Sequence, residues 1–262
     1  MIKKLTSQIY VALFFFLYFS LISGCGLFFG RQGLASISPA PALINSAAGY
    51  FSFKLEREGS IMRGRAFLIL VPGRGRLEIL DAIGRLVLIA LWSEQAEYLI
   101  LPSERAYWSG SQGRSKLMAE LIDLPLDPVE ILVWIVGQGK GLIPLAGELN
   151  LSWALRPHEE QNLPGQTPEP ANSGWQVEWA ETGKLRRGQK NGLRIEVQEY
   201  FKAKGVAKVL KFTHLSDSGR ITVLGLDFNQ NFSAENFQSD SIIEKSYRAI
   251  SWEEMKSFLR LH

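Results

Sequence analysis

The stretch from Gly49 to Gly110 constrains the fold most, because strand-length apolar runs follow one another there with very short separators. The separators are turn signals of two or three residues, such as Pro72-Gly73. Connections this brief allow only antiparallel neighbours. The sequence therefore predicts a meandering, strongly bent antiparallel sheet, with strands over 50–57, 61–71, 74–81, 85–92, 95–101 and 105–109.

The strand predicted at 85–92 is apolar on both faces. A sheet with one face in water alternates apolar and polar side chains, as Leu77 and Ile79 do with Arg76 and Glu78. Residues 86–91 contain no polar side chain at all. The second face of this strand must therefore be covered by protein, or it meets a partner or lipid.

Two short helices are predicted after the meander, at 115–122 and 128–136. The second has Asp127 as a cap, Pro128 in its first turn and Gly137 as its stop. Helices this short and apolar belong against a sheet. We then expect a strand at 145–155, a proline-rich loop at 156–174, strands at 175–180, 193–201, 206–214 and 220–229, and a last strand and helix within 242–262.

The basic stretch 184–190 is interpreted as a solvated hairpin tip between two of these strands. Contact with anionic lipid headgroups is the alternative.

The first 25 residues have the order of a secretory signal: Lys3 and Lys4, an apolar run over 9–22, small residues, and then Cys25, the only cysteine. The sequence Leu-Ile-Ser-Gly-Cys at 21–25 resembles the lipobox of bacterial lipoproteins. This resemblance implies cleavage before Cys25 and a diacylglycerol on its thiol. The alternative is an uncleaved helical anchor that continues through 26–29. Both interpretations tie the chain to a membrane, outside the cytoplasm.

We therefore expect a signal peptide at 1–24, a lipidated Cys25 with a flexible Ser-, Ala- and Pro-rich tether over 25–48, and one domain over 49–262. A single cysteine makes no internal disulfide, so the fold depends on a packed core, for which 46% apolar residues are ample. Losing Lys3 and Lys4 from 29 basic residues brings them close to the 26 acidic ones. This near neutrality argues against a nucleic-acid partner.

No catalytic set assembles from the sequence. His158, His214 and His262 are the only histidines, which leaves no spacing typical of a metal site. The serines at 109–113 miss the first glycine of a nucleophile elbow, and the glycines at 137–141 lack the spacing of a dinucleotide loop. We therefore expect no enzyme, no metal and no cofactor other than the acyl lipid on Cys25.

From residue 51 to about residue 229 the sequence resembles the LolA/LolB lipoprotein-localisation family, and specifically its lipid-anchored outer-membrane receptor. The match is densest at 76–84, Arg-Leu-Glu-Ile-Leu-Asp-Ala-Ile-Gly, and at 124–137, where Leu-Pro-Leu-Asp-Pro leads into a helix ending Trp-Ile-Val-Gly. The Trp-Gln-Val-Glu-Trp at 175–179 matches more loosely. The turn at 81–84 lacks the family's proline and has Ile for Leu, and 156–174 and the tail after 229 are longer than the family needs.

The resemblance implies a mainly β fold: an incomplete antiparallel barrel, or half-barrel, with short lid helices around an apolar cavity. It implies a membrane-insertion loop with one exposed apolar residue, at Ile83; a side chain folded back on the core is the alternative. By alternation, the candidates for an acyl cavity are Leu77, Ile79, Leu86, Leu88, Leu132 and Ile135. The same residues would also suit a filled barrel core.

The function implied is that of a monomeric receptor and insertion factor on the periplasmic face of the outer membrane, which accepts acylated lipoproteins from a periplasmic LolA-like carrier. Gly26 favours the outer membrane, because Asp after the cysteine retains enteric lipoproteins at the inner one. The alternative is a lipid-anchored envelope-assembly or lipid-binding subunit that transfers nothing. A hydrolase of envelope lipids is disfavoured by the missing nucleophile set.

Overall fold

A computed structural model describes residues 36–41, 44–93, 96–110, 127–137, 175–202 and 204–260. The chain divides into two units, Met1–Gly33 and Leu34–His262, and every described residue belongs to the second. Cys25 and the elements predicted at 115–122, 145–155 and 156–174 lie outside the described residues. Among the helices that are described, none is long and apolar enough to cross a membrane.

The first half of the sheet follows the predicted meander. Consecutive strands pair antiparallel, as their short connections require. The strands lie close to the predicted bounds: β1 (Ala47–Arg57), β2 (Ser60–Val71), β3 (Arg74–Asp81), β4 (Leu86–Trp92), β5 (Glu97–Leu101) and β6 (Ala106–Gly110).

The second half begins with helix α3 (Pro128–Val136), which has the predicted bounds. Five strands follow: β7 (Gln176–Trp179), β8 (Leu185–Lys190), β9 (Leu193–Tyr200), β10 (Ala207–His214) and β11 (Asp217–Phe228). The chain ends with two 3-10 helices, η4 (Ala234–Phe237) and η5 (Ser239–Ser241), a short strand β12 (Arg248–Ala249) and helix α4 (Trp252–Arg260).

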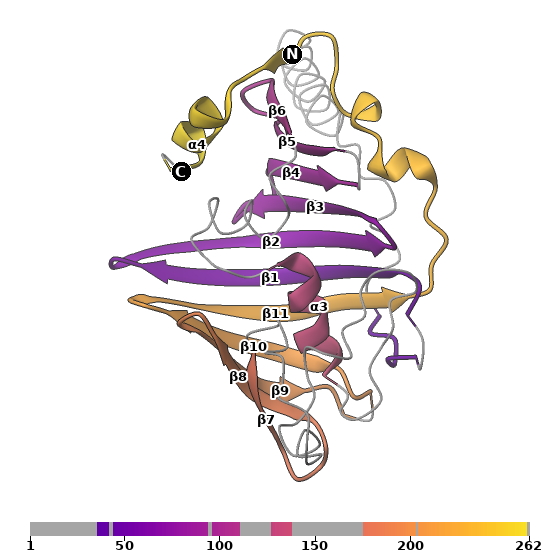
Figure 1. The fold of residues 1–262 in the computed structure, drawn as a ribbon, viewed down its shortest axis with the longest axis vertical. Helices are drawn as coiled ribbons and strands as arrows, with labels where there is room; N and C mark the ends of the chain where they lie inside the picture. The colour runs from indigo at the N-terminus through magenta and orange to yellow at the C-terminus, as the bar shows by residue number, and fades with distance from the viewer. Residues whose placement is uncertain are drawn as a thin grey trace, which may run out of the picture. The chain divides into compact units, whose positions relative to one another are not determined.

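All twelve described strands form one sheet, in the order β12-β6-β5-β4-β3-β2-β1-β11-β10-β9-β8-β7 (Figure 1). Strand β1 joins the two halves, because it pairs antiparallel with both β2 and β11. The two ends of this order, β12 and β7, do not pair with each other among the described strands, so the sheet is open. This confirms the predicted mainly β, unclosed antiparallel architecture.

Two hairpin tips, one in each half of the sheet, show how consecutive strands are connected by so few residues. Glu58 and Gly59 connect β1 to β2 with φ angles of 49° and 81°, and Asn191 and Gly192 connect β8 to β9 with 48° and 78°. Two-residue turns with positive φ match the twist of antiparallel strands.

One large apolar cluster covers a single face of the sheet, which we call the α3 face. Strands of both halves and both α-helices contribute to it, for example Leu68, Phe212, Trp134 of α3 and Met255 of α4. A sheet of this kind needs one face buried to be stable, and here two short helices share in the cover.

The opposite face of β2 and β3 is covered by the segment that follows β11. Arg76 donates to Glu78 Oε1 from Nε at 2.9 Å and from a terminal nitrogen at 2.6 Å, and it also donates to the Asn236 carbonyl at 3.1 Å. Phe232 and Phe237 pack beside this network against a cluster of Ala48, Phe67 and Ile69. The buried ion pair therefore fixes the tail to the sheet.

The same tail explains why β4 is apolar on both faces. Ile242, Ile243 and Tyr247 pack against a cluster of Ile89, Leu91 and Ile100 on the opposite face. The second face of β4 is thus covered by the chain's own C-terminal segment. This is the tail after residue 229 that is longer than the LolA/LolB family needs.

After covering that face, the tail reaches the edge of the sheet. Strand β12 pairs parallel with β6 through hydrogen bonds from Arg248 N to the Arg105 carbonyl and from Ile250 N to the Tyr107 carbonyl, each 2.9 Å long. Trp252 then packs against Trp108, with ring centroids 4.7 Å apart and ring planes tilted by 54°. This brings α4 onto the α3 face.

Two predictions about the elements of the fold are corrected by the structure. Residues 184–190 are not a hairpin tip, because 185–190 form strand β8, with Leu185 and Gly188 buried. The predicted flexible tether is folded at its C-terminal end: Ile44 is fully buried, and Ser38 N donates to the Leu226 carbonyl at 2.8 Å. A strand whose inward position is Gly188 lacks the apolar alternation by which strands are recognised.

Candidate functional site

Four of the six predicted cavity residues lie together in the cluster of the α3 face. Leu77 and Leu88 come from neighbouring strands and Leu132 and Ile135 from α3, and their exposed fractions are 7%, 4%, 3% and 0%. Ile79 is half-buried against the same cluster. The structure therefore brings these five residues to one apolar face and packs them there.

Leu86 lies on the opposite face, contrary to the alternation used to predict it. The β3–β4 pairing shifts register between Ile79 and Leu80, so that Ile79 pairs with Leu88 while Leu80 pairs with Leu86. Val87 is the extra residue of this bulge, and an extra residue reverses the side to which the next side chain points. Leu86 packs against the cluster under the C-terminal tail instead.

Helix α3 begins with a complete capping box. Val129 N donates to Asp127 Oδ1 at 2.8 Å, and Asp127 N donates to Glu130 Oε2 at 3.1 Å. Such a box satisfies backbone donors that a helix start otherwise leaves unpaired. The left-handed Gly137, at φ 43°, ends the helix as predicted.

Polar contacts tie α3 to the second half of the sheet. Glu130 Oε1 accepts from Lys190 Nζ of β8 at 2.6 Å and from the Trp175 indole at 2.9 Å. At the other end of the helix, Leu185 N donates to the Gly137 carbonyl at 3.2 Å. Towards the first half, α3 contributes apolar side chains to the shared cluster.

Close packing against β8 supports these bonds. Trp134 is 1% exposed and lies over Gly188, where an added Cβ would be 2.6 Å from the indole. Burial raises the pKa of the Tyr200 phenol well above its usual range, so the hydroxyl stays protonated and donates to the Leu185 carbonyl. Helix α3 is therefore firmly attached along one side.

The turn between β3 and β4 holds Ile83 out in solvent, with 77% of the side chain exposed. Asp81 Oδ1 accepts from Ile83 N at 3.0 Å and from Arg85 N at 2.8 Å, while Arg85 Nε donates to Asp81 Oδ2 at 2.7 Å. The Arg85 side-chain hydrogen bond is the main reason that the pKa of the Asp81 carboxyl lies below its usual value. Ile83 is thus displayed on a braced turn and does not fold back on the core.

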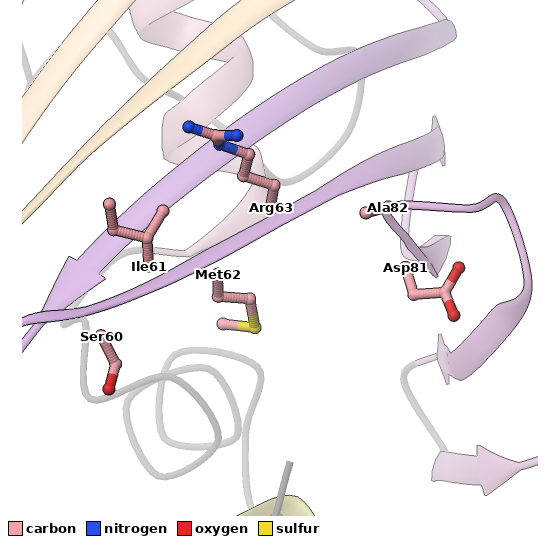
Figure 2. Close-up of a pocket in the computed structure, with 6 residues that line it drawn as sticks. All are labelled: Ser60, Ile61, Met62, Arg63, Asp81 and Ala82. Atoms are coloured by element: carbon pink, nitrogen blue, oxygen red, sulfur yellow. The ribbon is translucent and has the colours of Figure 1, made fainter.

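A hollow of about 590 Å³ lies beside this turn, where β2 extends past the end of β3. Figure 2 shows its lining, with Ile61 and Arg63 on one side of the β2 ribbon and Ser60 and Met62 on the other. Asp81 and Ala82 complete it. The predicted cavity residues are not among those that line this hollow.

Sequence reasoning missed three exposed apolar residues at the same end of the sheet. Ile61, Met62 and Leu215 expose 52%, 45% and 88% of their surface. The signal available for Leu215 was a leucine at a turn position between two strands, and for Ile61-Met62 an apolar pair inside a charged stretch. Together with Ile83 they are four of the five large apolar side chains exposed in the described part of the chain. Such a concentration of exposed apolar side chains at one end of the sheet is typical of an interaction surface.

No group of three or more His, Cys, Asp or Glu residues is placed to hold a metal ion within the described ranges. Cys25, the predicted lipidation site, lies outside those ranges.

No family model matches the sequence, and no curated protein matches it significantly. Among solved structures, a LolA superfamily protein from Nitrosomonas europaea is similar with 9% identity and a TM-score of 0.47, over 78% of this chain and 94% of that one. A domain named as an outer membrane lipoprotein-sorting protein from Vibrio parahaemolyticus has 12% identity and a TM-score of 0.44, over 76% and 92% of the two chains. A DUF1329 family protein from Desulfovibrio piger has 10% identity and a TM-score of 0.43, over 76% and 92%.

Proposed function

We propose that this protein is a lipid-anchored envelope protein that accepts the acyl chains of lipoproteins on its α3 face and releases them into the outer membrane. The observation that carries the proposal is the large apolar cluster of the α3 face, which spans both halves of an open sheet and includes side chains of two short helices. An acyl chain gains about 0.8 kcal/mol per buried methylene, so its transfer needs an apolar protein surface that replaces the bilayer.

Helix α3 is the proposed moving element, because its Leu132 and Ile135 are buried in the same apolar cluster as Leu77 of β3 and Leu88 of β4. Its polar contacts join it to β8, while its contribution to the first half of the sheet is apolar. We therefore propose that α3 stays attached to β8 and that its apolar side separates from the rest of the cluster. An acyl chain would replace the apolar contacts that this opening breaks.

Ile83 is the proposed membrane-contacting residue of the same function. Burial of one isoleucine in a bilayer contributes about 1.5–3 kcal/mol, enough to orient the turn but not to anchor the protein. The anchor would be the acyl lipid on Cys25, and a soluble periplasmic carrier would supply the cargo to the monomeric receptor. The reaction needs no cofactor and makes no covalent bond.

A second candidate is a lipid-anchored assembly or lipid-binding subunit with the same fold and no transfer activity. The observation that favours it is the dense packing of the predicted cavity residues, whose exposed fractions are 0–7% for Leu77, Leu88, Leu132 and Ile135. A filled core of this kind would need no occupant.

The deciding experiment uses residues 26–262 without the anchor, after circular dichroism has verified the fold. Uptake of a fluorescent triacylated peptide, from detergent or from a purified carrier, is compared for the native chain, Leu88→Glu and Leu86→Glu. The two variants introduce the same charge two positions apart in β4, on opposite faces. We expect uptake that only Leu88→Glu abolishes; folded protein without uptake would leave the second candidate.

The anchor is tested separately. Cells expressing the full chain are fed radioactive palmitate, and we expect label on the native protein and none on Cys25→Ser. Label on neither protein, with the chain still in the membrane fraction, would indicate the uncleaved helical anchor instead.

A further inference from the structure

Leu215 is unusual both in its backbone conformation and in its exposure to solvent. It stands at the tip of the β10–β11 hairpin with a φ of 51° and 88% of its side chain exposed. A left-handed backbone suits Gly and Asn and is unfavourable for a bulky residue. The corresponding position in the β8–β9 tip is Asn191, with a φ of 48°. Neither turn formation nor core packing therefore explains a leucine here.

A second unfavourable feature lies on the face opposite α3. Arg63 of β2 is paired with Lys54 of β1, Lys54 with Arg220 of β11, and Arg220 with Lys211 of β10. Alternation places all four on the face opposite the α3 cluster. Leu55, Ile221 and Phe212, each one position away from a member of the row, belong to that cluster, and so does Ala66, three positions after Arg63. We call these four residues the cation row.

Like charges directly across a sheet repel each other, so a row of four works against folding. Glu56 forms an ion pair with Lys54 at 3.4 Å, and Glu196 stands opposite Lys211 at the end of the row. Arg65 and Arg194 lie exposed on the same face, and so do Arg187, opposite Glu196, and its ion-pair partner Glu178. This makes seven cations against three carboxylates. This part of the surface is therefore strongly positive, although the whole chain has a net charge of only +3.

The apolar residues and the cation row belong to one surface. Ile61 precedes Arg63 by two positions on the same side of β2, as Figure 2 shows. Leu215 comes directly after the last residue of β10, the strand that contains Lys211. Arg57 Nε and Asp217 Oδ2, 3.4 Å apart, link the β1–β2 tip to the β10–β11 tip. Apolar side chains thus stand at the tips and cations lie behind them.

We propose that this surface, the cation row with Ile61 and Leu215, docks on an anionic phospholipid bilayer. The order of its parts matches a bilayer interface, where apolar side chains enter the acyl boundary and Lys and Arg reach the phosphates above it. An acidic protein would complement the cations but would not require apolar residues at the tips. The surface lies on the face opposite the proposed acyl site and is independent of that function.

The test uses the full chain held in nanodiscs of phosphatidylcholine, with or without phosphatidylglycerol. Hydrogen exchange of peptides covering 57–65 and 211–220 reports docking. We expect protection only with phosphatidylglycerol, and its loss in high salt. Each cation near an anionic leaflet strengthens binding about fivefold, so Lys211→Gln with Arg220→Gln lowers the docking constant about 30-fold. Arg74→Gln with Lys245→Gln, the same charge change at exposed positions outside the row, is the control.

Thermal melting of the variants shows whether the cation row and Leu215 serve docking or the stability of the fold. Lys211→Gln with Arg220→Gln removes repulsion, and Leu215→Asn places a residue that tolerates the left-handed turn, so both variants should melt no lower than the native chain while docking more weakly. Equal protection in both lipid compositions, or equal loss in the control variant, would overturn the proposal. Protection that requires another envelope protein would do so as well, and would indicate an acidic protein partner. Uptake of triacylated peptide stays unchanged in every variant, so failure of docking is distinct from failure of the acyl site.

Discussion

The bonds between α3 and β8 make a quantitative prediction. Glu130 accepts hydrogen bonds from Lys190, Trp175 and the Asp127 backbone, at 2.6, 2.9 and 3.1 Å. The Glu130 and Lys190 side chains are only 19% and 22% exposed, so water screens their attraction weakly. A hydrogen bond to a charged group contributes about 1.5–3 kcal/mol. We expect a coupling free energy between Glu130 and Lys190 near the lower end of that range, since neither side chain is fully buried.

The assay is a double-mutant cycle measured by urea unfolding, with Glu130→Ala, Lys190→Ala and the double variant. The matched control is the pair Glu199–Lys208, which has nearly the same 2.7 Å distance but side chains that are 51% and 39% exposed. Exposed pairs of this kind contribute about 0.2–1 kcal/mol. Equal coupling energies for the two pairs would refute the inference that Glu130 anchors α3 to β8.

Three further predictions address packing, the buried ion pair and the turn. Gly188→Val places a Cβ against Trp134 and should lower the free energy of unfolding by about 1–3 kcal/mol in urea, whereas an unchanged midpoint would show that α3 shifts freely. Arg76→Ala leaves the Glu78 carboxylate, 8% exposed, without its arginine and should cost about 3–5 kcal/mol in the same assay, with faster proteolysis of the tail. The pKa of the Asp81 carboxyl is lowered in the folded state, so its stabilisation of the turn is present above the ordinary aspartate pKa and is lost as pH falls through the folded value. Hydrogen exchange of the 81–85 amides should therefore become faster on acidification of the native chain. Asp81→Asn should show this faster exchange already at neutral pH.

Local signals determined the elements that the sequence predicts well. Helix α3 has its predicted bounds because Asp127, Pro128 and Gly137 act on their immediate neighbours. The meander was equally readable, because turns such as Pro72-Gly73 separate runs of alternating residues.

The features that were missed depend on residues far away in the sequence. Strand β8 presents Gly188 inward because Trp134 of α3 fills the space above it, and no pattern within β8 indicates this. Leu86 changes face because of a bulge that exists only in the pairing with β3. The cation row is visible only once β2, β1, β11 and β10 are placed side by side. The register of these strands aligns arginines and lysines that are far apart in the sequence.

The place of β1 between β2 and β11 has a consequence for how this chain folds. Ala47 pairs with Leu70, which is nearby in the sequence, and with Phe228, which is near the end of the chain. One edge of β1 can therefore pair only after most of the polypeptide has been synthesised. Closing so long a loop has a high entropic cost and slows folding. Until β11 has formed, the chain presents the first six strands with an unpaired edge at β1, and such an edge can pair with other chains. The pairing of β11 with β1 therefore also removes this exposed edge, and a chaperone that binds the unpaired form would contact β1.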